Sequence, residues 1–142
     1  MAKPGPKIPI GMPSDRSALA RAAALLGPLE GRIMRAVWSG AVEKTFVVRN
    51  VQELMPELAY TTVMTTLARL AQKGLLTAKS VPGQKAHRYR AAGGPRDFLA
   101  QASRQDVGEI VRRYGDAALA AFAEELDRLS DERRRRLEEL IK

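Results

Sequence analysis

Four threonines lie within six consecutive positions of the segment LAYTTVMTTLARLAQKG, which spans residues 58–74. Two cationic residues follow at helical spacing, and together with the threonines they make a set of six: Thr61, Thr62, Thr65, Thr66, Arg69 and Lys73. A hydroxyl can hydrogen-bond a nucleic-acid base or a phosphate, a threonine methyl can contact a thymine methyl, and the cations can reach phosphates or guanine. Because threonine is a mediocre helix former, this cluster indicates ligand recognition rather than helix stability.

Catalytic and metal-binding chemistry has little support in the residues. The chain has no cysteine and one histidine, His87, which we expect in a basic strand. These residues form no Ser/His/Asp or Cys/His set and no zinc cluster, and the sequence has no phosphate-binding glycine loop. We predict that the protein is not an enzyme and uses no cofactor or metal.

The absence of cysteine favours a reducing cytoplasm. No stretch approaches the roughly 20 apolar residues of a membrane span, so we expect a cytoplasmic protein with no membrane partner.

Positive charge is concentrated in the first two thirds of the chain. The net charge is +8; residues 1–92 carry fourteen Lys/Arg against five Asp/Glu, a net of +9, and residues 93–142 carry ten against eleven, a net of −1. The window from Leu58 to Arg96 contains seven bases and no acid. This asymmetry predicts a polyanion-binding part joined to a part with another role.

The first residues predict an extension ahead of the folded domain. Residues 1–16 are rich in Pro and Gly with scattered bases, as in a flexible arm. Ser14 or Asp15 can cap a short alanine-rich helix over 16–26. We assign residues 1–25 to a flexible basic N-terminal extension.

Three helices are predicted between the extension and the wing. Pro28 suits a first helical turn, and apolar residues repeat at helical spacing as far as Trp38. A second short helix covers Val48 to Met55 and stops at Pro56, because the residue before proline avoids the helical region. A third helix follows within a few residues.

This third helix divides into two faces when its residues are projected at helical spacing. The predicted inward face holds Val63, Met64, Leu67, Ala68, Leu70, Ala71 and Gly74. The predicted outward face is Thr61, Thr62, Thr65, Thr66, Arg69, Gln72 and Lys73, with no acid among them. The helix N-terminus, with free N–H groups and partial positive charge, is then open to a phosphate.

A basic hairpin is predicted next. LLTAKSV and AHRYRA flank Pro82-Gly83, which suits the centre of a type II turn. Leu76 and Tyr89 are expected to pack toward the helices. The bases placed outside or near the tip include Lys85, Arg88 and Arg90.

The C-terminal third predicts three helices, over about 96–114, 116–129 and 131–142, with Ser130 as the last N-cap. The last helix has a narrow apolar stripe and is marginal alone, so a second subunit is expected to cover it. The predicted dimerisation residues are Phe98, Leu99, Ile110, Val111, Tyr114, Phe122, Leu126, Leu129, Leu137, Leu140 and Ile141.

The predicted fold class is mainly α with a small β-wing. A winged helix-turn-helix domain over 26–92 precedes a helical dimerisation region over 93–142. In such motifs the second helix enters the major groove of DNA.

The stretches LGPLEGRIMRAVW, LAYTTVMTTLARLAQKGLL and HRYRAA resemble the penicillinase-repressor family, BlaI/MecI. The resemblance covers roughly residues 26–142. It implies a homodimeric repressor whose winged helix reads a palindromic operator and whose C-terminal helices pair the subunits. It also implies a recognition helix from Tyr60 to Lys73, a wing carrying Lys85, Arg88 and Arg90, and release of DNA when the dimerisation region is cleaved or disrupted.

Departures from the family pattern concern induction. In the β-lactam-responsive members a sensor protease cuts an Asn-Phe bond, and the corresponding bond here is Ala121-Phe122, which lacks the Asn. The cysteine pairs of copper-responsive relatives are also absent.

The sequence leaves two alternatives open. One is a ligand-sensing winged-helix regulator of another type; the other is a non-specific nucleic-acid-binding protein. Few aromatics and no stacking platform weigh against single-strand binding.

Overall fold

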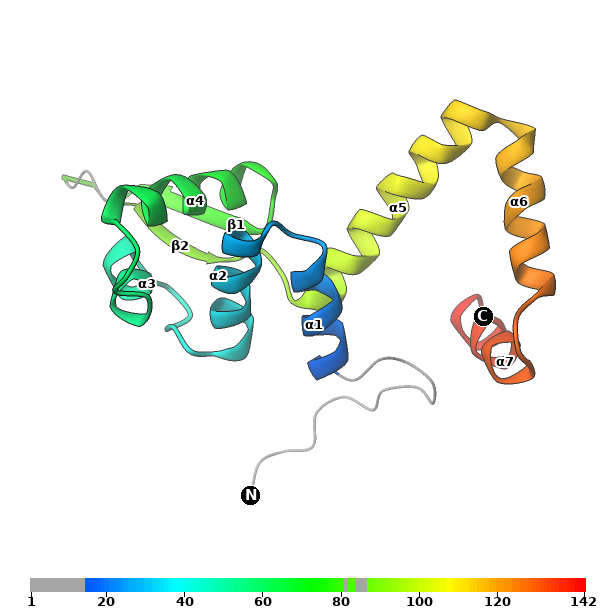
Figure 1. Ribbon diagram of the computed structural model, residues 1–142, viewed down its shortest axis with the longest axis horizontal. Helices are drawn as coiled ribbons and strands as arrows, with labels where there is room; N and C mark the ends of the chain where they lie inside the picture. Colours follow the sequence, from blue (N-terminus) through cyan, green and yellow to red (C-terminus); the bar gives the residue numbers. More distant parts are fainter. Residues whose placement is uncertain (1–14, 81, 84–86) are drawn as a thin grey trace, which may run out of the picture. The chain divides into compact units, whose positions relative to one another are not determined.

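The computed structural model describes residues 15–80, 82–83 and 87–142 (Figure 1). These residues form seven helices and one two-stranded antiparallel sheet, which confirms the predicted fold class. The elements are α1 (Asp15–Ala24), α2 (Pro28–Ser39), α3 (Val48–Leu54), α4 (Tyr60–Gln72), β1 (Leu76–Ser80), β2 (His87–Ala91), α5 (Pro95–Tyr114), α6 (Asp116–Asp127) and α7 (Asp131–Leu140).

The described chain divides into two compact units, Asp15–Ala100 and Gln101–Lys142, here called the winged unit and the tail unit. The division therefore falls inside α5, eight residues after the end of the predicted DNA-binding domain at residue 92.

The apolar core of the winged unit lies between α2, α3, α4 and the hairpin. Its fully buried side chains come from three helices and the α2–α3 connection, and the largest are Ile33, Met34, Phe46, Val51, Val63, Leu67 and Leu70. The helical spacing of these apolar residues in the sequence is the reason that each helix turns one face inward. Since the core is built from all these elements, it fixes the position of α4.

The ends of α2 follow from the local sequence. Gly27 is its N-cap and Pro28 is its first residue, where the missing proline N–H costs no hydrogen bond. Gly40 ends the helix with φ of 85°, a left-handed conformation that glycine adopts without steric cost. The Ala41 N–H then bonds the Ala36 carbonyl at 2.9 Å and closes the last turn.

The wing is a hairpin in which Leu76 pairs with Ala91 and Ser80 with His87. Tyr89 is also paired on its other edge with Phe46, through N–H to carbonyl bonds of 2.9 and 2.8 Å. Leu76 and Tyr89 are both buried, as predicted, and burial raises the pKa of the Tyr89 phenol. The hairpin is therefore anchored to the core along one face.

Helix α1 corrects part of the predicted flexible extension over residues 1–25. The expected alanine-rich helix forms over Asp15–Ala24, and Ala18, Ala22 and Ala23 are buried in the winged unit. A Cβ added at Gly31 would lie 2.7 Å from the Ala23 carbonyl oxygen. Only small residues allow so close a helix approach, so glycine and alanine join α1 to the domain.

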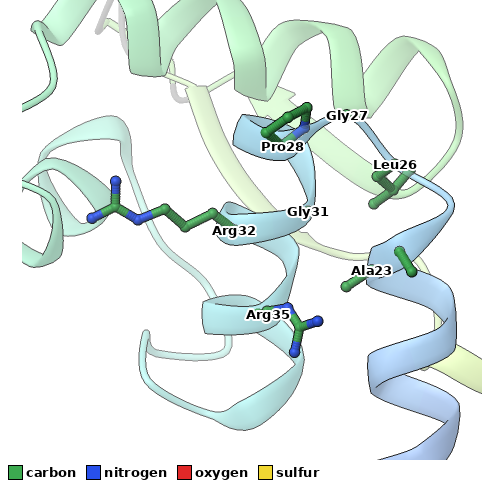
Figure 2. A pocket seen from close by; sticks show the side chains of 8 residues that line it. Ala23, Leu26, Gly27, Pro28, Gly31, Arg32 and Arg35 are labelled. Carbon is green, nitrogen blue, oxygen red and sulfur yellow. The ribbon is translucent and has the colours of Figure 1, made fainter.

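A shallow hollow borders this contact between α1 and α2 (Figure 2). Ala23 and Leu26 lie on one side of it, and Gly27 and Gly31 lie on the other. Figure 2 shows Arg32 extending to the side of α2 that is opposite α1, where its guanidinium pairs with Glu57.

The tail unit is built differently. Its buried apolar side chain is Ala118, whereas the larger apolar residues of α5, α6 and α7 stay exposed or half-buried. Ser130 caps α7 as predicted, by accepting a hydrogen bond from the Arg133 N–H at 3.2 Å. The helices of this unit are thus well defined locally but share little core.

Candidate nucleic-acid interface

Helix α4 has one broad solvent-exposed side in the winged unit. Its exposed residues are Tyr60, Thr61, Thr62, Met64, Thr65, Ala68, Arg69 and Gln72, with the C-cap Lys73. Neither Asp nor Glu is among them. This surface, here called the α4 face, contains most of the predicted DNA-binding residues of the helix.

Thr66 is a correction to the predicted outward face. Its side chain is 5% exposed and its Oγ1 donates a 2.7 Å hydrogen bond to the Thr62 carbonyl. The residue lies at the border of the helix projection, where the core reaches it, and the helix itself satisfies its hydroxyl. Thr66 therefore contributes mainly to packing, and its hydroxyl is already hydrogen-bonded within the helix.

Met64 and Ala68 are a second correction, because they were expected to face inward. Met64 is 43% exposed and Ala68 is also exposed. The buried side of α4 is centred on Val63, Leu67 and Leu70, and it extends to Thr66 rather than to Met64. A domain this small covers only a narrow arc of the helix, so apolar residues at the edge of the arc remain in solvent.

A shallow hollow of about 300 Å³ lies along one edge of the α4 face. It is lined by threonines 61, 62, 65 and 66 and Arg69 of α4, and by Leu29 of α2. The hollow brings hydroxyl groups and one guanidinium together on a solvent-accessible surface. Such a surface can hydrogen-bond polar groups of a duplex.

Lys73 has a partner that the sequence analysis missed. Its Nζ donates to both carboxylate oxygens of Glu30, at 2.9 and 2.8 Å, and the Glu30 side chain is 13% exposed. Sequence offered no signal for this pair, because the residues are 43 positions apart. Although the sequence from Leu58 to Arg96 contains no acid, the fold places Glu30 against Lys73 at the C-terminal end of α4.

The acid that immediately precedes α4 in the sequence forms an ion pair. Glu57 pairs with Arg32 of α2. A hydrogen bond to backbone, followed by the one from Arg32, holds the pKa of the Glu57 carboxyl below its usual value. The N-cap of α4, Ala59, makes no side-chain cap. The first N–H groups of the helix thus lack a capping side chain, as an anion-binding helix end would require.

The wing gathers cationic groups on one face. Arg88 and Arg90 alternate with buried Tyr89 along β2, and the strand register places Lys79 opposite Arg88. All three cationic residues are exposed. They therefore lie on the side of the sheet that faces away from the core. The predicted wing residue Lys85 lies outside the described residues.

The predicted dimerisation residues fall into two groups. Phe98 and Leu99 belong to the winged unit, where the Phe98 ring packs against Trp38 with centroids 6.0 Å apart. In the tail unit the exposed members are Ile110, Tyr114, Leu126, Leu140 and Ile141, and the half-buried members are Val111, Phe122, Leu129 and Leu137. Phe98 thus packs against an apolar side chain of its own chain, whereas the exposed members of the tail unit have little apolar contact within the chain.

The candidate cleavage bond, Ala121-Phe122, lies in the middle of helix α6. Ala121 is exposed and Phe122 is half-buried. The backbone of this bond is helical, unlike the exposed loop tips at which proteolytic nicking concentrates.

The described ranges contain neither a metal-ion cluster nor a membrane-spanning helix. No cluster of three or more His, Cys, Asp or Glu side chains suited to a metal ion occurs in them. None of their helices combines the length and apolar character that crossing a bilayer requires.

The three-helix core, the exposed α4 face and the anchored hairpin define a winged helix-turn-helix module. The family described as penicillinase repressor matches residues 26–142, so the chain belongs to that family, whose members are transcriptional regulators and not enzymes. The predicted resemblance and the non-enzymatic class are confirmed.

Two kinds of comparison identify similar proteins, one by sequence and one by fold. The transcriptional regulator BlaI of Mycobacterium tuberculosis, from strains CDC 1551 and H37Rv, is 41% identical over 78 residues, covering 53% of this chain and 54% of BlaI. The chain thus spans about half the length of the curated relatives it matches. TrmBL2, an archaeal chromatin protein whose structure shows a mode of DNA binding, has a TM-score of 0.51 at 21% identity, covering 77% of this chain and 40% of TrmBL2. That similarity concerns the fold.

Proposed function

We propose that this chain is a homodimeric transcriptional repressor that binds a palindromic operator in double-stranded DNA. The observation that carries the proposal is the α4 face, which is exposed, contains no acid and belongs to the second helix of a helix-turn-helix in a family of repressors. A solvent-exposed helix normally mixes both signs of charge, so this composition fits a polyanionic partner.

The proposed contacts separate into two kinds. Thr61, Thr62 and Thr65 meet base edges in the major groove, where short hydroxyl side chains allow close approach. Arg69 reaches guanine or phosphate from the next turn. The wing cations Lys85, Arg88 and Arg90 contact phosphates, which supplies affinity that does not depend on sequence.

Lys73 has a smaller role in this proposal than its charge implies. Because Glu30 holds its ammonium with two short hydrogen bonds, Lys73 contributes to DNA binding only to the extent that phosphate competes with the carboxylate. The Glu30–Lys73 pair also ties α4 to α2 and so positions the α4 face.

The dimer is supported by the composition of the tail unit. Ile110, Tyr114, Leu126, Leu140 and Ile141 are between 41% and 74% exposed, and a second copy would bury them. Two winged units on half-sites about one helical turn apart would combine their affinities. This is why the operator is proposed to be palindromic.

Release from DNA is proposed to act through the tail unit. Cleavage by a sensor protease near Ala121-Phe122, or another disruption of the helices, would separate the subunits and leave each winged unit with a single half-site. Because this bond lies within α6, cleavage requires local unfolding of that helix first. A cytoplasmic location stays a prediction.

Selection of bound fragments from a random duplex library by the full chain tests the proposal. We expect two inverted half-sites, two chains per duplex, and loss of at least tenfold in affinity when one half-site is scrambled. Enrichment of a single unrepeated site by a monomer would contradict the dimeric form of the proposal. Equal binding to all duplexes would contradict specific recognition.

A further inference from the structure

An apolar strip runs along the α4 face. It consists of Tyr60, Met64 and Ala68, which are spaced four residues apart and so lie on one line of the helix surface. Tyr60 is 45% exposed and Met64 is 43% exposed, although the neighbouring Val63 and Leu67 are fully buried. The core therefore does not account for the strip, and no other described element covers it.

The exposed residues of α4 up to Ala68 are all neutral. They comprise the strip and three threonines, Thr61, Thr62 and Thr65. The cations of the helix begin at Arg69. This part of α4 thus offers hydroxyl groups, a thioether, methyl groups and a phenol, which suit the edges of bases better than phosphates.

The strip and the shallow hollow lie along opposite edges of the α4 face, because none of the three strip residues lines the hollow. On the other side of the threonines, Leu29 of α2 lines the shallow hollow. The threonines are therefore flanked by the apolar strip on one edge and by α2 on the other.

We propose that Met64, supported by Ala68, reads the 5-methyl group of a thymine in each operator half-site. This inference rests on the proposed function and adds a specificity determinant to it. The thymine methyl is the one apolar group that base pairs present in the major groove. Methionine is unbranched and polarisable, so its side chain adapts to the position of a methyl group. The small side chain of Ala68 lets the strip approach the base edges.

The consequence is a preference for a particular class of half-site. It contains a thymine next to the base pairs that Thr61 and Thr65 contact, and it loses affinity when that thymine is replaced by cytosine or uracil. Uracil is the more informative replacement, because it keeps the hydrogen-bonding groups of thymine and lacks only the methyl.

The test uses the full chain and a duplex selected by it from a random library. Each thymine of one half-site is replaced singly by deoxyuridine, and the dissociation constant is measured at fixed salt. At one position we expect the wild-type affinity to fall about fourfold, the value that corresponds to burial of one methyl group. In Met64→Gln, which has a similar length and a polar end, the same replacement should have less than a 1.5-fold effect.

Leu25→Gln is the matched control, because Leu25 is a 62% exposed apolar residue in the turn after α1. This variant should retain the full fourfold effect of deoxyuridine.

A wild-type chain that binds its selected duplex but is insensitive to every deoxyuridine overturns the inference and leaves the proposed function intact. Sensitivity that persists in Met64→Gln overturns it as well. Failure to select any duplex would instead contradict the proposed function. Thermal unfolding checks that both variants fold.

Discussion

The winged unit and the tail unit bury their apolar residues to very different extents. In the winged unit, Ile33, Leu67 and Leu70 reach full burial, whereas in the tail unit Ile141 is 74% exposed and Leu119 is 55% exposed. Both units are helical and both show apolar periodicity. The difference teaches that helical periodicity alone does not reveal whether a helix is covered by its own chain or by another.

The contrast also separates two roles in one chain. A unit with its own core can hold α4 in a fixed position, as recognition of a groove requires. A unit without its own core needs a second subunit to cover its apolar residues, so its folding and association can change when that subunit is lost. We infer that DNA reading belongs to the first unit and that its control belongs to the second.

The largest expected effect comes from a charge in the exposed apolar surface of the tail. Ile110→Asp places an unpaired carboxylate where the second subunit is proposed to pack, so the dimer should dissociate. We expect a loss of at least 100-fold in operator affinity, with winged-unit folding unchanged. Sedimentation and a binding titration measure the two quantities.

Gln105→Asp adds the same charge to α5 at an exposed polar position and should retain both the dimer and the affinity. If Ile110→Asp stays dimeric and binds as the wild type does, the tail surface around Ile110 is not the interface.

The second effect tests the core of the winged unit. Phe46→Ala removes a ring that is 1% exposed and stacked near Tyr89, and should cost about 3–5 kcal/mol of unfolding free energy. Leu119→Ala in the tail should change the same transition by less than about 0.5 kcal/mol. The only tryptophan of the chain, Trp38, lies in the winged unit and reports its denaturant unfolding by fluorescence.

Similar costs for Phe46→Ala and Leu119→Ala would show that the two units unfold together. The independence of the winged unit would then be wrong.

A third, intermediate effect compares the same substitution in two helices. Gly31→Ala forces a methyl against the Ala23 carbonyl, so α1 and α2 must separate, at a cost of about 1–3 kcal/mol. Gly108→Ala in α5 meets only the end of the Arg112 side chain, at 3.9 Å, and should stabilise its helix by roughly 0.5–1 kcal/mol. Thermal unfolding of the two variants measures whether each substitution destabilises or stabilises the protein. If both substitutions change stability in the same direction, the close α1–α2 contact is contradicted.

The smallest effect concerns the pair at the end of α4. Glu30→Gln releases Lys73, so random-duplex affinity should rise a few-fold, and the slope of log affinity against log salt should steepen by about one per protomer. Glu43→Gln removes an exposed acid for which the described residues supply no ion-pair partner, and should leave the slope unchanged. Identical slopes in the two variants would show that Lys73 does not reach phosphate even when released.

Local sequence predicted the elements well, because caps and periodicity act over a few residues. Pro28 and Ser130 mark helix starts through backbone geometry that neighbouring residues determine. The hairpin followed from two short strands around Pro82-Gly83, and Gly83 has φ of 78°. Such features need no knowledge of the rest of the fold.

The exposure of individual side chains and the long-range contacts depend on tertiary packing, and the sequence did not predict them. Thr66 and Met64 exchanged faces relative to the prediction, because a small core covers a narrower arc of α4 than an even division of the helix assumes. Glu30 reached Lys73 across 43 positions. Helix α1 joined the winged unit because Gly31 admits the Ala23 backbone, a contact that neither residue signals alone.

The central claim is that the α4 face selects the sequence and the wing supplies affinity. The ratio of affinities for a selected duplex and a random duplex, measured at one salt concentration for the wild type, Thr65→Ala and Arg88→Ala, tests it most directly. We predict that Thr65→Ala lowers the ratio about tenfold, the effect of one lost base contact, and that Arg88→Ala weakens both complexes and keeps the ratio. Equal loss on both duplexes in Thr65→Ala would contradict the claim.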